Sequence, residues 1–488
     1  MWNSEEFNRI CEIERKKTNR NGLIAVLLAA VIITMFFLGY FVREITEPNS
    51  GQKLNEIIKI IEDKSVWATE MSADDLAEQL VNKLLVDDKY AKYYSPSEYK
   101  RVQKEDSGAY SGVGVAFDAL GTVAQVNMNS PAYKSGVNVG DKIVAGVYKK
   151  DVQTDEESDK IFTNFSEKLL EEQEENEEKT IFDIYGEFFA DFELGEEFDV
   201  EIRRGDKIIE LTLKKENYTV AYVEYYDSES YFYFSTEKET VKEQGKDVEK
   251  DVFGARVEIG RGNPELSVDT AYIRLCAFEG TAATQFNGAL DYMKQQGRTK
   301  LIIDLRGNGG GLIGVLTEIA SYLVYDNGKP QIKVLKVKEK LSETHYSTSG
   351  DNFYDNITDI SVIANCGTAS ASEALIGALN DYGDSVEYGG ANFSLNNLVL
   401  TGYNAERKTY CTYGKGIMQT TYGLKSGGAL MLTTAYIYWP VSKDESGKPI
   451  CIQDVGITTP VEENCVSDEN AIKRANEILH TVIEETQD

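Results

Sequence analysis

The chain has 488 residues, a length typical of two to four domains, and its 42% hydrophobic residues are enough to bury substantial cores. Acidic residues outnumber basic ones 81 to 51, which gives a formal charge of −30 and argues against a nucleic-acid partner. Two histidines, His345 and His480, are too few for a His-rich metal site. The six cysteines form no CxxC pair, so we expect buried thiols, with a Cys451–Cys465 disulfide as the alternative.

An uncharged run, Leu23–Val42, is long enough to cross a bilayer of roughly 30 Å as a helix. Four basic residues precede it: Arg15, Lys16, Lys17 and Arg20. By the positive-inside rule, residues 1–22 form a cytoplasmic tail, and the rest of the chain lies outside a bacterial cell membrane as a single-pass protein. A cleaved signal peptide is the alternative, but the run is long for one and no A-x-A-like cleavage site follows it.

After the apolar run, helical spacing over residues 51–104 predicts a helical lead-in. Residues 105–217 change to short strands separated by glycines. Their order, with Gly112-Val113-Gly114-Val115 before a strand and S-P-A-x-x-x-G before G-D-x-I, resembles a PDZ domain. In such a domain the N–H groups of the 112–115 loop bind a peptide carboxylate. The acidic stretch 151–179 interrupts this pattern and is typical of a solvated helix or a mobile insertion.

Two strand–turn–helix units follow in the region 218–466. The first runs from the strand 300–305 through Arg306-Gly307-Asn308-Gly309-Gly310-Gly311 into the helix 312–324. Its glycines can point backbone N–H groups at a ligand. Gly309, Gly311 and Gly314 satisfy a dinucleotide-binding pattern, while an oxyanion hole is the competing interpretation.

The second unit runs from the strand 359–364 into Thr368-Ala369-Ser370-Ala371-Ser372-Glu373 and a further helix. Ser370 at such a turn is either a nucleophile, with the amide of Ala371 facing its oxyanion, or merely a helix N-cap. Further on, Lys415 stands between two glycines with Gln419 four residues later. A buried lysine loses part of its affinity for a proton and can serve a serine as general base.

Together these segments resemble the C-terminal processing peptidases, also called tail-specific proteases, which are S41 serine peptidases. The resemblance rests on D-L-R-G-N-G-G-G, T-A-S-A-S-E, Y-G-K-G-I-M-Q, the PDZ pattern and the later L-T-T-A. It implies a crotonase-like α/β core over residues 218–466, joined to the PDZ-like domain and followed by a C-terminal helix, 467–488. It also implies a Ser-Lys dyad in which Ser370 is the nucleophile and Lys415 the base. Gln419 would orient the lysine, and the amides of Gly310 and Ala371 would form the oxyanion hole.

The resemblance therefore predicts a membrane-anchored endopeptidase that needs no metal or cofactor. Its substrates would be proteins or peptides with free C-terminal tails, and the lead-in and tail helices are candidates for a homo-oligomer interface. The segment Asn392–Tyr410 is longer than the family pattern, so we expect a polar, loop-like insertion beside the site. If that insertion displaced Lys415, the chain would instead be a catalytically silent PDZ-type scaffold.

Overall fold

The computed structural model describes residues 73–481 except 85, 107–108, 119, 152–159, 175–178, 244–245, 349–351 and 426. The predicted tail 1–22, the predicted membrane helix Leu23–Val42 and residues 51–72 of the predicted lead-in lie outside the described residues. None of the described helices is both long and apolar enough to span a bilayer. From Val81 onward the chain forms one compact unit.

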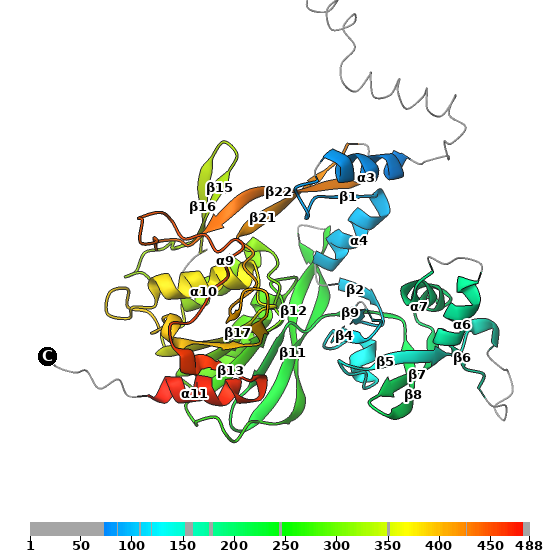
Figure 1. Ribbon diagram of the computed structural model, residues 1–488. Coiled ribbons are helices and arrows are strands. Elements are labelled where there is room, and N and C mark those ends of the chain that lie inside the picture. The colour runs from blue at the N-terminus through cyan, green and yellow to red at the C-terminus, as the bar shows by residue number, and fades with distance from the viewer. Residues whose placement is uncertain are drawn as a thin grey trace, which may run out of the picture. The chain divides into compact units, whose positions relative to one another are not determined.

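The described chain begins with helix α3 (Ala73–Leu84), the short strand β1 (Lys92–Tyr94) and helix α4 (Pro96–Asp106) (Figure 1). A β-rich module follows, with the elements β2 (Ala109–Gly112), β3 (Val115–Phe117), β4 (Val123–Val126), α5 (Pro131–Lys134), β5 (Lys142–Gly146), β6 (Thr163–Asn164), α6 (Phe165–Gln173), α7 (Ile181–Ala190), β7 (Glu197–Arg204), β8 (Lys207–Lys214) and β9 (Glu216–Thr219). The change to short strands predicted for residues 105–217 is therefore present, together with the helices α5, α6 and α7.

The acidic stretch 151–179 contributes helix α6, which packs against α7. Phe165, the first residue of α6, is buried among the aromatic side chains of this module. On the outer side, Lys168 and Lys179 both pair with Glu172 and Glu187. The described part of this stretch is thus a packed helix with paired charges, and the described residues contain no cluster suited to a metal ion.

The larger part of the unit is built on an eight-stranded sheet in the order β12-β11-β10-β13-β14-β17-β18-β23. The strands are β10 (Val223–Tyr226), β11 (Ser230–Glu243), β12 (Lys246–Arg261), β13 (Thr270–Leu275), β14 (Lys300–Asp304), β17 (Asp359–Asn365), β18 (Leu398–Thr401) and β23 (Cys465–Val466). From β13 to β23 the neighbours are parallel, and helices lie in the connections from β13 to β14, β14 to β17 and β17 to β18. This is an α/β fold, as predicted.

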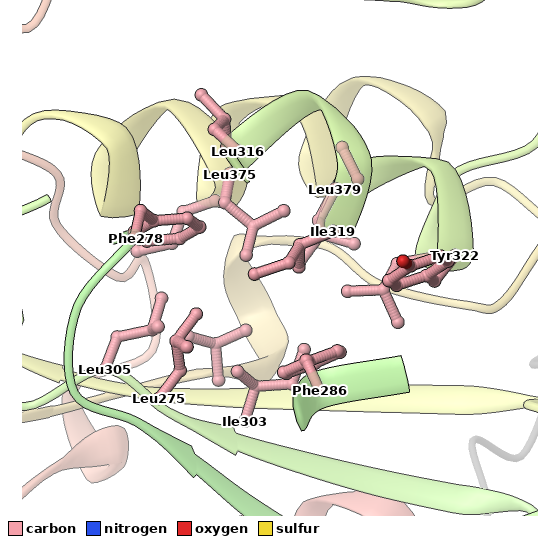
Figure 2. Close-up of a cluster of buried hydrophobic side chains, with 14 of the residues drawn as sticks. Leu275, Phe278, Phe286, Ile303, Leu305, Leu316, Ile319, Tyr322, Leu375 and Leu379 are labelled. Atoms are coloured by element: carbon pink, nitrogen blue, oxygen red, sulfur yellow. The ribbon is translucent and has the colours of Figure 1, made fainter. Parts of the chain in front are cut away.

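Successive side chains along each parallel strand point to opposite faces of the sheet, and both faces are apolar. Leu301 and Ile303 of β14 point to one face, which is covered by α8 (Ala282–Gln295), α9 (Ile313–Leu323) and α10 (Ala371–Tyr382). Figure 2 shows this core, where Phe286, Leu316 and Leu375 meet the strand residues. Ile302 points to the opposite face, where α11 (Ala471–His480) packs. Because both faces are buried, these strands read as continuous hydrophobic runs.

The expectation of a loop-like insertion at Asn392–Tyr410 was wrong. Residues Leu398–Thr401 form β18, an inner strand of the large sheet, and all four are fully buried. Only the short β19–β20 hairpin, Tyr403–Asn404 and Thr409–Tyr410, is added beyond it. The strand is too short to show a hydrophobic periodicity, and the polar residues around Leu398-Val399-Leu400 gave the segment the pattern of a loop.

A second sheet combines β1 with β15 (Lys333–Glu339), β16 (Glu343–Ser347), β21 (Ile417–Gly423) and β22 (Ala429–Tyr438). β21 and β22 form an antiparallel hairpin, and β1 pairs with the first residues of β22. This pairing brings the segment before β1 next to β22, where Asp88 contacts Thr433.

Candidate active site

The two predicted turns meet because they follow neighbouring parallel strands, β14 and β17, at the same edge of the sheet. Asn308 joins them. Its carbonyl oxygen accepts hydrogen bonds from the Ala369 amide at 2.9 Å and the Ser372 hydroxyl at 3.0 Å. Its side-chain amide donates to the Leu275 carbonyl oxygen at 2.8 Å, at the end of the adjacent strand β13. One fully buried asparagine therefore fixes the turns to each other and to the sheet.

Ser370 is distinguished from the other two hydroxyl residues of its turn by its surroundings. The hydroxyls of Thr368 and Ser372 are fully buried and donate to the carbonyl oxygens of Leu305 and Asn308. Within the described structure the Ser370 hydroxyl forms no hydrogen bond in which it donates, and Ser370 lines a cavity of about 1660 Å³. Of the three hydroxyls, only that of Ser370 is available to a substrate.

The backbone at Ser370 is unusual for a residue with a side chain. Its φ is 57° and its ψ is −115°, and α10 begins at the next residue. Such a conformation costs on the order of 1–3 kcal/mol and persists only when surrounding contacts enforce it. Here it turns the serine out of the sheet edge at the positive end of a helix dipole.

Glu373 is the main contact that enforces this geometry. Its carboxylate is fully buried and accepts four hydrogen bonds. Oε2 accepts from the backbone amides of Ser370 and Lys415, both at 2.9 Å. Oε1 accepts from the Thr412 hydroxyl at 2.5 Å and the Gly414 amide at 2.8 Å. Burial raises the pKa of Glu373, and the four hydrogen bonds oppose that rise.

Lys415 is therefore held beside Ser370 through its backbone, and the β18 region does not displace it. Burial lowers the pKa of Lys415; the carboxylate of Glu373 opposes this shift and the positive charge of Lys89 adds to it. Among the described residues, however, no hydrogen bond joins Nζ of Lys415 to Ser370. Nζ instead lies over the ring of Tyr90, 4.8 Å from its centroid.

Gln419 also has a partner other than the lysine. Its side-chain amide donates to Oγ1 of Thr433 at 3.1 Å, across the β21–β22 hairpin. The backbone amide and the hydroxyl of Thr433 both donate to Asp88 at 2.8 Å. Gln419 lines the same cavity as Ser370 and Lys415, so the three predicted side chains share one site.

The two predicted oxyanion donors are placed differently. Ala371 is the first residue of α10, and its amide donates to no group among the described residues. The amide of Gly310 donates to Oδ1 of Asn308 at 2.9 Å, within its own turn. A side chain at Gly310 would meet the Ala371 nitrogen and Cβ of Ser370, both at 2.8 Å, and its φ is +98°. Only glycine allows this close approach.

The dinucleotide interpretation of Gly309, Gly311 and Gly314 finds no support in this packing. A Cβ at Gly311 would lie 2.4 Å from the carbonyl oxygen of Phe278, so that glycine serves contact with the protein's own backbone. The Ser370 turn packs against the same loop at Gly310.

The histidines take no part in the site, and of the described cysteines only Cys276 lines the cavity. His345 lies on the exposed strand β16, and Nε2 of His480 lies 2.8 Å from Asp269. Neither lines the cavity with Ser370. The described cysteines are free, so the Cys451–Cys465 disulfide is absent.

The cavity extends from Ser370 to the loop 112–115 of the β-rich module. Gly112 and Gly114 have φ values of +138° and +85°, which side chains rarely allow. The amides of Val113 and Gly114 donate to no acceptor among the described residues, whereas Val115 opens strand β3. This loop therefore offers N–H groups without a partner among the described residues to the same cavity that Ser370 lines.

Comparisons with known proteins agree with this chemistry. Residues 269–399, which hold both turns and Ser370, match the peptidase family S41. The matched region is therefore a peptidase S41 domain, and the chain is a serine peptidase. Among its relatives is a "Probable CtpA-like serine protease" of Staphylococcus aureus (strain COL), 24% identical over 446 residues that cover 90% of this chain and 72% of the relative. The protein of the same name from Staphylococcus saprophyticus is 22% identical over 442 residues, 88% of this chain and 72% of that one.

Two solved structures are also similar. The photosystem II D1 C-terminal processing protease is 19% identical, with a TM-score of 0.44 over 87% of this chain and 91% of that one. A putative S41 protease from Bacteroides fragilis is 13% identical, with a TM-score of 0.43 over 87% and 94%.

Several residues that build the site were missed by the sequence reasoning. Glu373 stands three residues after Ser370, and this S-x-x-E spacing is a capping-box signal that was available. Asn308 lies within a motif that was noted only for its glycines. Asp88, Tyr90 and Thr412 carry no local signal, because their roles depend on contacts between segments far apart in the chain.

Proposed function

We propose that this serine peptidase is a membrane-anchored endopeptidase with a Ser-Lys dyad. Ser370 is the nucleophile, Lys415 the general base and Gln419 its orienting partner. The observation that carries the proposal is that Ser370 presents the one available hydroxyl of its turn while sharing the Glu373 carboxylate with the backbone of Lys415. The segment Leu23–Val42 would be the anchor.

In the reaction, neutral Lys415 takes the proton of the Ser370 hydroxyl as its oxygen attacks the carbonyl carbon of the scissile peptide bond. The resulting oxyanion accepts a hydrogen bond from the Ala371 amide, and from Gly310 once that amide leaves Asn308. Protonated Lys415 then gives its proton to the leaving amine. Water, activated by the same lysine, hydrolyses the ester at Ser370. Burial favours the neutral lysine that the first step needs.

Substrate recognition follows from the free N–H groups of Val113 and Gly114, which suit a peptide carboxylate. We infer that the β-rich module acts as a PDZ-like domain, which holds a C-terminal tail while the chain ahead of it reaches Ser370 through the shared cavity. Neither the binding loop nor the dyad calls for a metal or an organic cofactor.

The test is cleavage of an unfolded model protein by the full chain, with labelling of Ser370 by a fluorophosphonate as a second readout. Ser370→Ala and Lys415→Ala are expected to abolish cleavage, and Gln419→Ala to reduce it less. Lys425→Ala, at an exposed lysine, is the matched control and is expected to cut normally. Full cleavage by Lys415→Ala would refute the base assignment. Absence of cleavage and labelling in the unmodified chain would favour a protein that binds without cutting.

A further inference from the structure

The segment before β1 lies against both predicted partners of the nucleophile. Asp88 accepts two hydrogen bonds from Thr433, and the Thr433 hydroxyl in turn accepts from Gln419. The amide of Tyr90 donates to Oδ1 of Asp88 at 3.1 Å. The pairing of β1 with β22 fixes the segment immediately afterwards. Tyr90 is thereby held in place by the same strands that carry Gln419.

The ring of Tyr90 is the partner of the Lys415 ammonium. Nζ lies 4.8 Å from the ring centroid, within the range of a cation–π contact. Burial raises the pKa of Tyr90, with Tyr413 adding to the rise and Lys89 opposing it, so the phenol is neutral at physiological pH. The attraction therefore comes from the ring face, which stabilises the charged lysine and leaves the neutral lysine without this contact.

We propose that Tyr90 is a positioning residue for Lys415: its ring binds the ammonium form away from Ser370 and thereby sets the pH above which the lysine is released as a base. This proposal rests on the assignment of Lys415 as the base. Nothing about the ring contact is required by the dyad itself, since a lysine bonded directly to the serine would need no aromatic partner.

The ring contact acts on the pKa of Lys415 together with the other charged groups around it. The carboxylate of Glu373 favours the ammonium form, whereas burial and the nearby Lys89 oppose it. Tyr413 acts on Tyr90, whose pKa it raises further. Against these opposing influences, a cation–π contact shifts the balance by ~0.4–0.7 of a pH unit, the range for a partly exposed pair.

The experiment measures the rate of fluorophosphonate labelling of Ser370 against pH in the full chain. Tyr90→Leu removes the ring. It is expected to move the acid limb of the pH–rate profile, where labelling rises as Lys415 loses its proton, to lower pH by ~0.5 unit. At a pH below the midpoint of that limb, the labelling rate then rises about three-fold. Tyr90→Phe retains a ring and is expected to keep the limb near its original position. Tyr90→Trp offers the strongest cation–π partner and is expected to move the limb to higher pH.

If Tyr90 has a purely structural role, Tyr90→Leu is expected to lower the labelling rate at every pH and to leave the position of the acid limb unchanged. Tyr94→Leu is the matched control, because Tyr94 lies on the same segment beneath another lysine, with Nζ of Lys92 5.0 Å from its ring. It is expected to leave the limb unchanged. If Tyr90→Leu does not fold, the test is the shift of the limb to higher pH in Tyr90→Trp relative to Tyr90→Phe, and equal positions in the two variants would overturn the proposal.

Two failures can be told apart. Labelling of Lys415→Ala at the original rate would refute the base assignment and this inference with it. Loss of labelling in Lys415→Ala together with an unmoved limb in Tyr90→Leu would overturn the role of Tyr90 alone.

Discussion

Removal of the Glu373 carboxylate tests whether one buried group holds the proposed nucleophile Ser370 and the proposed base Lys415 together. In Glu373→Gln, one oxygen becomes an amide nitrogen that cannot accept a hydrogen bond. If the nitrogen replaces Oε2, the amides of Ser370 and Lys415 both lose their acceptor. If it replaces Oε1, the Thr412 hydroxyl can turn round to accept from it, and only the Gly414 amide is left unpaired. The second orientation therefore lowers the free energy of unfolding by less than the first.

The magnitude follows from this count. One buried, unpaired backbone amide costs about 1–3 kcal/mol, so Glu373→Gln is expected to lower the free energy of unfolding by that amount. Glu373→Ala leaves four donors without an acceptor, for a loss of roughly 4–12 kcal/mol. That is comparable with the whole stability of a typical domain, so the alanine variant is expected to lose the Lys415 loop or to unfold.

Denaturant unfolding and fluorophosphonate labelling of Ser370 would be measured on the same samples. Glu343→Gln, on the exposed strand β16, is the control and is expected to match the unmodified chain within about 0.5 kcal/mol. Unfolding of Glu373→Gln at the unmodified free energy, with full labelling, would refute the reasoning, because four donors would then need no carboxylate.

The ionisation of Glu373 makes the stability of the chain depend on pH, and the direction of that dependence follows from the pKa shift of Glu373. Burial raises the pKa of Glu373 above its ordinary value of 4.5 in the folded state. The carboxyl therefore binds its proton more tightly when folded. Its stability contribution is fully present below 4.5 and falls as the pH rises through the folded pKa. The stability difference between the unmodified chain and Glu373→Gln, which does not titrate, is expected to narrow over that window.

Two further predictions concern other parts of the unit. Gly310→Ala places a Cβ 2.8 Å from Ala371 and Ser370 at a φ of +98°, so it is expected to destabilise the chain by more than about 1 kcal/mol and to suppress labelling; normal labelling would contradict the packing. Asp141 is buried, which by itself raises its pKa, but hydrogen bonds that include two from Arg204 lower it overall. Its stabilisation is present above its ordinary pKa of 3.8 and is lost as the pH falls through the lower folded value, so acid unfolding of Asp141→Asn is expected to lack that component.

Much of the catalytic half could be predicted because its signals are local. The runs Leu301–Ile303 and Val362–Ala364 are hydrophobic without interruption, as expected of strands buried on both faces, and each leads through glycines or small residues into a helix. The turn at Ser370 follows from that order alone. The choice of Ser370 over Thr368 and Ser372 came from family resemblance, and the structure supplies the physical reason in the partners of the other two hydroxyls.

Strand β18 shows where local signals end. Leu398–Thr401 is short and flanked by polar residues, so its pattern is that of a loop. Its burial depends on β17 and β23 at its two edges and on α11 across its face. Those partners come from distant parts of the chain, and no window around the strand contains them.

The sequence by itself determined the strand–turn–helix units, the glycines that permit close backbone approach, and the residue types from which a serine nucleophile and a lysine base can be made. Tertiary structure decided which groups those residues touch. The four donors at Glu373 and the ring of Tyr90 above Lys415 come from separate segments that meet only when the sheets assemble. The protonation and position of a side chain depend on such neighbours, because burial and contacts at a few ångströms set the energy of its charged form.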